Sequence, residues 1–134
     1  MMDQIKGAKY DDRKPRPSLV PVEAIEAIMQ VREFGKAKYA DAEDWRKVPR
    51  EKWLDALLRH VLHIWDNPLA IDDESGLPAL WHVITNAAFL CAAYKGDLQE
   101  AQIKWTKWKI DRVAAALERS NDKWAIPTSP EEQP

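Results

Sequence analysis

Apolar residues recur every three or four positions along most of the chain, which is the spacing that places them on one face of an α-helix. Polar or proline-containing stretches divide this pattern into four segments, at residues 21–38, 50–66, 77–95 and 98–120. We find no useful length of alternating apolar and polar residues, as a half-buried strand would have, and no internal repeat. The pattern therefore predicts an all-α protein, a single-domain bundle of about four helices with short loops.

Two segments have an apolar stripe that we expect to be buried. The stripe of segment 21–38 comprises Val22, Ile25, Ile28, Met29 and Phe34. The stripe of segment 50–66 comprises Leu54, Leu57, Leu58, Val61, Leu62 and Trp65. Segment 77–95 is apolar on nearly all sides, which is typical of a helix at the centre of its fold. Gly96 and Asp97 are expected to end it. Segment 98–120 mixes apolar and charged residues, so it either completes the core or packs against a second subunit.

The two ends of the chain differ from the middle. Residues 1–17 are polar and include two prolines near their end, which predicts an extended N-terminal arm. Residues 121–134 are rich in proline and acidic residues, which predicts a flexible C-terminal tail. The helical domain is therefore expected to occupy residues 18–120.

The charge balance and the use of cysteine narrow the partners. The formal net charge is −2, without the basic stripe that a protein binding a nucleic-acid duplex usually has. No apolar run reaches the roughly 18 residues that a membrane span needs, and we expect no signal peptide. Cys91 is the only cysteine, so it forms no disulfide within the chain. We expect it to be a small core residue in a reducing, cytoplasmic compartment.

The central segment contains two polar residues among apolar neighbours. His82 and Asn86 are four positions apart, so they share one face of a helix. A buried polar group must be hydrogen-bonded or bound to a ligand, and a carbonyl is the ordinary partner of a core histidine. Asp72, Asp73 and Glu74 precede this helix. They either complement the positive end of the helix dipole or supply the oxygen ligands that Mg²⁺ prefers.

Segment 50–66 contains a second polar group at its middle. Arg59 is suited to hold phosphate oxygens and His60 to orient a ligand. Asp55 and Arg59 also have the spacing of an ordinary ion pair on a solvated face. His60 and His63 have a spacing compatible with a transition metal, but the sequence around them lacks the other features of a zinc motif.

Segment 21–38 and the residues after it offer carboxylates, lysines and rings. Glu23 and Glu26 have the ExxE spacing by which one helix presents two carboxylates to a metal, or they belong to a solvated face. Gly35 and the residues after it are expected to end the helix in a loop. Lysines in that loop suit phosphates and its rings suit stacking on a base, although loops also carry lysines for solubility alone. The residues concerned are Lys36, Lys38, Tyr39 and Trp45.

Taken in order, these residues resemble a known family. The resemblance lies in KYDDRKPRPSLVPVEAIEAIMQVREFGKAKYADAEDW and ALLRHVLHIWDNPLAIDDESGLPALWHVITNAAFL. They are similar to phage and prophage proteins described as dATP/dGTP diphosphohydrolase N-terminal domains, relatives of the all-α MazG-like nucleoside triphosphate pyrophosphohydrolases. The similarity covers about residues 9–94. Its marks are Lys38-Tyr39, Trp45, Arg59-His60, Asp72, Ser75-Gly76, His82 and Asn86.

The resemblance implies a Mg²⁺-dependent or Mn²⁺-dependent enzyme that hydrolyses dATP and dGTP to the monophosphate and pyrophosphate. It further implies a homo-oligomer, a dimer or larger, in the cytoplasm of a phage-infected or prophage-carrying bacterium. We expect catalytic roles for His60, His82 and Asn86. We expect substrate binding by Lys36, Lys38, Tyr39, Trp45, Arg59 and Ser75. We expect metal binding by Asp72, Glu23 and Glu26.

Two positions depart from the family pattern. Ala79 stands where the family usually has His, and Ala40 stands where it often has Gly. The second ExxD motif of the MazG-like enzymes is also absent, because segment 77–95 offers His82 and Asn86 instead. Two other classes of function therefore stay open. One is a non-catalytic protein that sequesters a nucleotide, and the other is a helical protein-interaction module with segment 98–120 as its partner surface.

Overall fold

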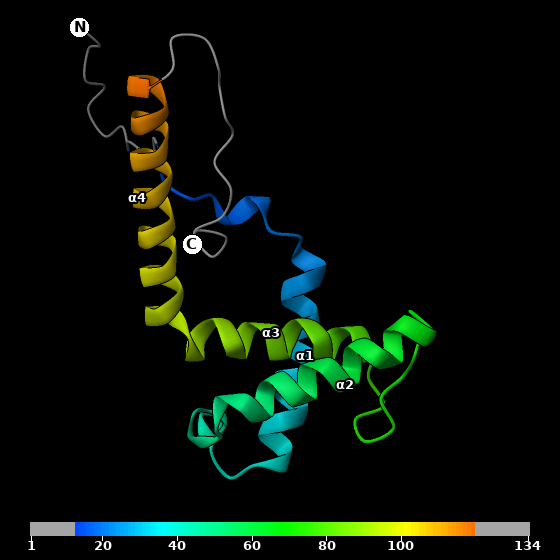
Figure 1. Cartoon of the computed structure of the whole chain (residues 1–134). Coiled ribbons are helices and arrows are strands. Elements are labelled where there is room, and N and C mark those ends of the chain that lie inside the picture. Colours follow the sequence, from blue (N-terminus) through cyan, green and yellow to red (C-terminus); the bar gives the residue numbers. More distant parts are fainter. Residues whose placement is uncertain (1–12, 120–134) are drawn as a thin grey trace, which may run out of the picture.

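The computed structural model describes residues 13–119, and four α-helices make up most of that range (Figure 1). They are α1 (Val22–Lys38), α2 (Arg50–Asp66), α3 (Ala79–Ala93) and α4 (Lys95–Arg119). Two short 3₁₀-helices also occur, η1 (Pro17–Leu19) and η2 (Asp44–Lys47). The β-structure of the described residues is a single bridge between Ile71 and Pro78. The predicted all-α fold with four helices is confirmed.

Prolines mark the start of three helices. Pro21, Pro49 and Pro78 each stand immediately before α1, α2 and α3, respectively. A proline disfavours helical conformation in the residue before it. Val20 and Val48 are accordingly extended, with ψ of 129° and 132°, and they end η1 and η2. The helix boundaries thus follow from local sequence.

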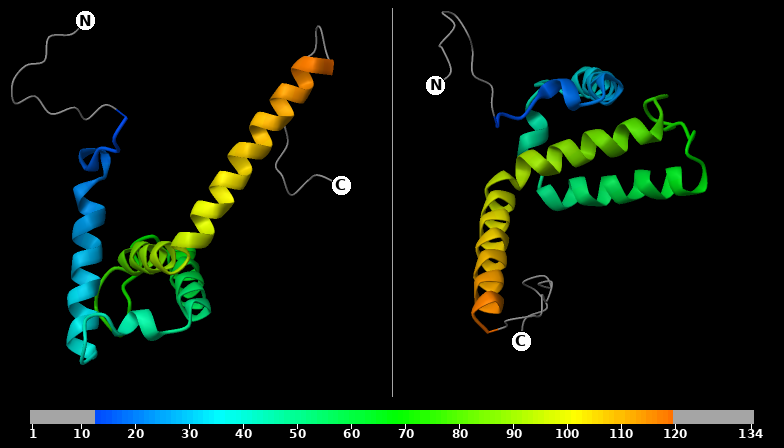
Figure 2. Two further views of the ribbon diagram at one scale, coloured as in Figure 1. Left: turned by 90° about the vertical axis from the view of Figure 1, so that its left-hand side faces the viewer. Right: turned by 90° about the horizontal axis from the view of Figure 1, so that it is seen from above.

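Helix α3 lies at the centre of the described structure. It packs against α2 and against α1, and α4 leaves from its end (Figures 1 and 2). Helices α2 and α3 run antiparallel, since Trp53 meets Phe89 and His60 meets His82. The prediction that this apolar segment is central is confirmed. The buried residues are accordingly concentrated on α3, with two more on α1: Ala79, His82, Thr85, Asn86, Ala27 and Val31.

Helix α4 points away from the other three helices (Figure 2). The chain bends at Tyr94, where φ is −101° and ψ is 13°, and α4 begins at the next residue. Its first turn is tied to α2 by an ion pair between Arg50 and Asp97, with 2.9 Å between Nη1 and Oδ2. The guanidinium of Arg50 also lies 4.0 Å from the centre of the Tyr94 ring. Segment 98–120, which the sequence allowed to complete the core, therefore does not do so in the described chain.

Two predicted helix ends are wrong by a few residues. Gly96 and Asp97 lie inside the first turn of α4, because the break falls at Tyr94. Gly35 does not end α1, whose last turn also contains Lys36 and Lys38. A glycine in a helix costs roughly 0.5–1 kcal/mol relative to alanine, which the surrounding helical sequence can offset. Tyr39, whose N–H donates to the Gly35 carbonyl, is the first extended residue after α1.

Much of the predicted apolar core is exposed in the described chain. In α1 the exposed members of the stripe are Val22, Ile25 and Met29. In α2 they are Leu54, Leu58, Leu62 and Trp65. Cys91, predicted as a core residue, is also exposed. The reason is shared: α3 covers one side of α1 and one side of α2, and α4 does not fold back over the rest.

Parts of the predicted organisation fall outside the described residues. These parts are residues 1–12 of the arm and the whole tail at 121–134. Residues 14–16 of the arm form no helix and lead into η1. Among the described residues, no helix is both long enough and apolar enough to cross a membrane.

Candidate functional site

A pocket of about 250 Å³ lies between α1, α2 and α3, beside η2 and the loop before α3. It brings together most of the residues singled out in the sequence, which are Lys38, Tyr39, Trp45, Arg59, His60, Asp72, His82 and Asn86. Lys36, Glu23 and Glu26 do not line it. Ser75 does not line it either, but its hydroxyl bonds to two residues that do.

The loop before α3 is a tight turn that fixes the acidic residues. The N–H of Asp72 donates to the Leu77 carbonyl, and the N–H of Gly76 donates to the Asp72 carbonyl, both at 2.8 Å. Gly76 has a φ of +71°, in the left-handed region that glycine adopts at little cost. The turn therefore requires its glycine and holds Asp72 and Ser75 against the first turns of α3.

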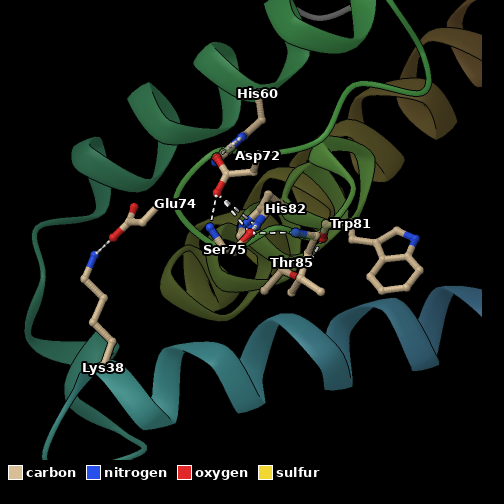
Figure 3. A network of polar contacts seen from close by, with 9 residues as sticks. Lys38, His60, Asp72, Glu74, Ser75, Trp81, His82 and Thr85 are labelled. Atoms are coloured by element: carbon tan, nitrogen blue, oxygen red, sulfur yellow. Dashed lines mark hydrogen bonds and ion pairs between the residues drawn. The ribbon is translucent and has the colours of Figure 1, made fainter.

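A hydrogen-bonded network joins this turn to α3 (Figure 3). The Ser75 hydroxyl lies 2.9 Å from Asp72 Oδ2 and 2.7 Å from His82 Nε2. The backbone N–H of Ser75 donates to the same carboxylate oxygen at 2.9 Å, and the N–H of Leu77 donates to the Ser75 hydroxyl at 3.1 Å. His82 Nε2 itself lies 3.7 Å from Asp72 Oδ2. Two donors of Ser75, its backbone N–H and its hydroxyl, thus converge on one carboxylate oxygen.

The arrangement of donors fixes the tautomer of His82. An ionised carboxylate only accepts hydrogen bonds, and a serine hydroxyl has one proton to donate. Ser75 therefore donates to Asp72 and accepts from Leu77 N–H and from His82 Nε2–H. A neutral His82 then carries its proton on Nε2 and leaves Nδ1 as the nitrogen that can accept a proton.

Two stacked imidazoles form the polar end of the pocket. The rings of His60 and His82 are 4.7 Å apart at 15°, and His60 Nδ1 lies 4.0 Å from Asp72 Oδ1. Burial lowers the pKa of both histidines below the ordinary 6.5, so both are mainly neutral near pH 7. Burial alone would raise the pKa of Asp72, but the hydrogen bonds from Ser75 outweigh it and the net shift is downward. This end therefore combines neutral proton acceptors with an ionised carboxylate.

Charged groups stand at the rim of this polar end. Lys38, at the end of α1, forms an ion pair with Glu74 of the turn (Figure 3). The hydrogen bond to Glu74 is the main cause that raises the pKa of Lys38, so the ammonium stays charged. Arg59 of α2 also lines the pocket. This side of the pocket therefore offers two cations, of which Lys38 is paired with a carboxylate.

Aromatic rings form the other end of the pocket. Trp45 of η2 stacks on Phe89 of α3 with 4.3 Å between ring centres and 15° between planes. Trp53 of α2 packs on Phe89 at 4.8 Å and donates its Nε1–H to the Trp45 carbonyl at 3.2 Å. The Arg32 guanidinium lies 5.3 Å from the Phe89 ring centre and donates to the Ala42 carbonyl. Flat, electron-rich faces of this kind suit an aromatic ligand.

Three of these residues were not predicted as site residues. Phe89 and Trp53 had a readable signal, because helical spacing extends the face of Asn86 to Phe89 and the face of His60 back to Trp53. Arg32 had none, because it reads as one charge on a polar helix face. Glu74 was named among the acidic residues before α3, but its ion pair with Lys38 joins residues 36 positions apart, which helical spacing does not indicate.

Ala79, where the chain departs from the family pattern, does not line this pocket. Its side chain is fully buried. It lies at the start of α3, where its N–H donates to the Ala70 carbonyl at 2.8 Å and closes the turn.

The carboxylates offer a partial metal site. In residues 13–119 no group of three or more His, Cys, Asp or Glu side chains is arranged to hold a metal ion. Glu26 stands 12 residues before Lys38 on the same helix, which is about 18 Å along its axis, so α1 does not bring Glu23 and Glu26 to Asp72. Mg²⁺ in phosphate-transfer sites typically takes one or two carboxylates and completes its shell with substrate phosphates and water. Asp72 and Glu74 fit that smaller requirement.

Comparison with known proteins assigns the chain to a family. A family model described as "dATP/dGTP diphosphohydrolase, N-terminal" matches residues 4–103. The chain belongs to this family. A protein of Salmonella phage PMBT28 named dATP/dGTP diphosphohydrolase is 33% identical over 84 residues, which are 63% of this chain and 28% of that protein. The chain thus spans well under half the length of that relative. No solved structure matches the chain.

The family match encloses the whole pocket. The residues that line it run from Val31 to Phe89, inside the matched range 4–103. The match ends within α4 at Ile103, so most of that helix lies beyond the family region. Family membership therefore bears on the pocket and says little about α4.

Proposed function

We propose that this chain hydrolyses dATP and dGTP to the monophosphate and pyrophosphate in the pocket between α1, α2 and α3, with a divalent cation, Mg²⁺ or Mn²⁺. Membership of the dATP/dGTP diphosphohydrolase N-terminal family supports this assignment. The observation that carries it is the division of the pocket, with the neutral pair His60–His82 beside Asp72 at one end and the Trp45–Phe89 stack at the other. A nucleotide has the same division into phosphates and base.

The triphosphate would occupy the polar end. Lys38 and Arg59 would neutralise phosphate charge, and they would do so more strongly as charge moves to the leaving pyrophosphate. Water attacks the α-phosphorus, its proton passes to His82 Nδ1, and the bond from that phosphorus to the bridging oxygen breaks. Asp72, acting through Ser75, holds His82 in the required tautomer.

Asp72 and Glu74 would hold the cation together with the phosphates. When bound there, the cation supplies charge neutralisation and lowers the pKa of water. Glu74 would exchange its ion pair with Lys38 for this contact, which frees the ammonium for a phosphate. The base would lie against Trp45 and Phe89. We place the activity in the cytoplasm of a phage-infected bacterium, in keeping with the phage relative.

The test is incubation of the purified protein with each of the eight common nucleoside triphosphates, with Mg²⁺, with Mn²⁺ and with EDTA. We expect dAMP or dGMP and pyrophosphate from the purine deoxynucleotides, and no product in EDTA. His82→Gln should lose turnover, while His63→Gln, a change on an exposed part of α2, should keep it. Absence of turnover in the wild-type chain under every condition contradicts the proposal. Thermal-shift measurements would then show whether the chain sequesters a nucleotide instead.

We further propose that the active form is a homo-oligomer in which a second copy covers α2. The exposed stripe on α2 is continuous along the helix, and Trp65 at its end is 84% exposed. Soluble monomers rarely leave such a contiguous apolar surface open to water. A second copy of the chain is the partner that is present wherever the protein is made.

A further inference from the structure

Asn86 is a buried amide without a partner. Its side chain is 6% exposed and lines the pocket, and no hydrogen bond of the described residues involves it. An asparagine amide has two protons to donate and an oxygen with two lone pairs, and leaving them unpaired in the interior costs free energy. No fully buried side-chain nitrogen or oxygen in residues 13–119 lacks a partner. The unpaired amide atoms of Asn86 therefore still reach the space of the pocket.

The position of Asn86 lies between the two ends of that pocket. His82, Asn86 and Phe89 follow one another on one face of α3. At 1.5 Å per residue, Asn86 is about 6 Å along the axis from His82 and about 4.5 Å from Phe89. It makes no hydrogen bond to Ser75 or Asp72, and the catalytic role expected from the sequence stays a prediction.

The opposite wall leaves room beside this amide. Helix α2 runs antiparallel to α3, with Trp53 against Phe89 at 4.8 Å and His60 against His82 at 4.7 Å. The same register places Ala56 across from Asn86, and Ala56 also lines the pocket. Its single methyl group fills little of the space that a larger residue would occupy. A flat ring held at the aromatic end of the pocket, beside Trp45 and Phe89, would thus have its edge at the level of the amide.

We infer that Asn86 is the residue that reads the edge of the purine base. This inference rests on the proposed function and narrows it to a mechanism of base recognition. The amide presents a donor and an acceptor side by side. Adenine presents its N6 amino group beside a ring-nitrogen acceptor, and guanine presents O6 beside N1–H. Rotation of the amide by half a turn satisfies either purine, which accounts for one pocket that takes both dATP and dGTP.

The first test uses Asn86→Asp, because an ionised carboxylate accepts and does not donate. It matches the N1–H and N2 amino group of guanine and opposes the ring nitrogen of adenine. We expect the ratio of Kd for α,β-methylene dATP to Kd for α,β-methylene dGTP to rise at least about tenfold, in mildly alkaline buffer with Mg²⁺. Asn67→Asp makes the same chemical change at an exposed position and should leave the ratio unchanged.

The second test uses the wild-type chain and so does not depend on a variant that folds. An analogue of dATP that lacks the 6-amino group should bind about tenfold more weakly than dATP itself. Equal affinity for the two overturns the inference, as does an unchanged purine ratio in folded Asn86→Asp. If the wild-type chain binds neither methylene analogue, the proposed function fails together with the inference. If it binds both and only the ratio tests fail, the inference alone is wrong.

Discussion

Ser75 has one hydroxyl proton, and the group that accepts it determines the direction of the hydrogen bonds at the polar end of the pocket. Because Asp72 takes that proton in a hydrogen bond, the histidine on the other side of the hydroxyl must act as a donor through Nε2. The Ser75 hydroxyl thus determines which nitrogen of His82 is basic. The substrate-binding role expected for Ser75 stays a prediction, and in the structure its hydroxyl bonds to Asp72, His82 and Leu77.

Replacement of Ser75 by alanine should therefore reduce both stability and turnover. It leaves hydrogen-bonding groups of Asp72 and His82 unpaired in a partly buried place, which should cost about 1–3 kcal/mol in the free energy of unfolding. It also releases the tautomer of His82, and we expect kcat for dATP or dGTP to fall about tenfold or more. Urea unfolding and product chromatography measure the two effects. Ser18→Ala, at an exposed serine of η1, is the control, and equal behaviour of the two variants would contradict the assigned role.

Acid should destabilise the fold in two separate ranges of pH. The pKa values of His60 and His82 lie below 6.5 in the folded chain, so below pH 6.5 the unfolded chain binds more protons than the folded one. The free energy of unfolding should therefore decrease as pH falls from about 7 to about 5. The pKa of Asp72 is lowered from 3.8, so its contribution is lost only below that value.

Urea unfolding at a series of pH values measures this dependence. The double variant His60→Gln/His82→Gln should show a shallower decrease between about pH 7 and about pH 5 than the wild-type chain, because two of the groups responsible are gone. Ser18→Ala, which changes no titratable group, should keep the wild-type slope. An unchanged slope in the double variant would show that the stacked pair does not account for the acid sensitivity.

At the scale of elements, the turn between α2 and α3 positions the residues at the polar end of the pocket. It is closed by the Asp72–Leu77 and Gly76–Asp72 hydrogen bonds. It holds Asp72, which the proposal assigns to the cation and to the orientation of His82, against α3. The Ser-Gly of the sequence was recognised as a mark of the family, but its physical reason is the left-handed conformation of Gly76.

Gly76→Ala should destabilise the chain by about 1–2 kcal/mol, because an L-residue is strained at a φ of +71°. An added methyl group meets no atom within 4 Å, so the cost is one of backbone conformation. Gly96→Ala is the matched control. It lies within a helix with open space around it, and we expect it to raise stability by about 0.5–1 kcal/mol. Thermal unfolding of both variants measures the difference, and a loss of equal size at both positions would contradict this account.

The helices themselves were predictable, and the reason is local. Their periodic apolar residues and the prolines before α1, α2 and α3 act within a few positions of the chain. The shared face of His82 and Asn86 was predictable, because residues four apart on one helix must share a face. The grouping of His60, His82 and Asp72 joins two helices and a loop, and it was expected only from the family resemblance. Trp45 was expected to bind the base, but its stacking on Phe89 was not predicted. The contact of Trp45 with Phe89 joins residues 44 positions apart in the sequence, and helical periodicity holds no information about such a pair.

At the scale of the whole molecule, the apolar stripes have the predicted helical spacing, but the described chain does not bury them as predicted. Leu58 and Leu62 have the spacing of buried residues, yet they are 52% and 69% exposed. An apolar stripe on a helix indicates that the surface is covered, but it does not say whether the cover comes from the same chain. The spacing of the stripe therefore could not predict whether the same chain buries it.

The double variant Leu58→Glu/Leu62→Glu tests the proposed assembly. Carboxylates on that surface would be buried against a second copy, so we expect the variant to elute as a monomer where the wild-type chain is a dimer or larger. Size-exclusion chromatography with light scattering, over a range of concentrations, measures the mass. Lys52→Glu places the same side chain elsewhere on α2 and should leave the assembly intact. A wild-type chain that is monomeric at every concentration would contradict the proposed homo-oligomer.

The direction of α4 has a consequence for hydrogen exchange. Its backbone amides are paired within the helix, but beyond the first turn little of the described chain packs against it. In an isolated copy these amides would exchange with solvent through local opening, whereas the amides of α3 would exchange only when the whole domain unfolds. A single chain would then contain two populations of protected amides, separated at Tyr94.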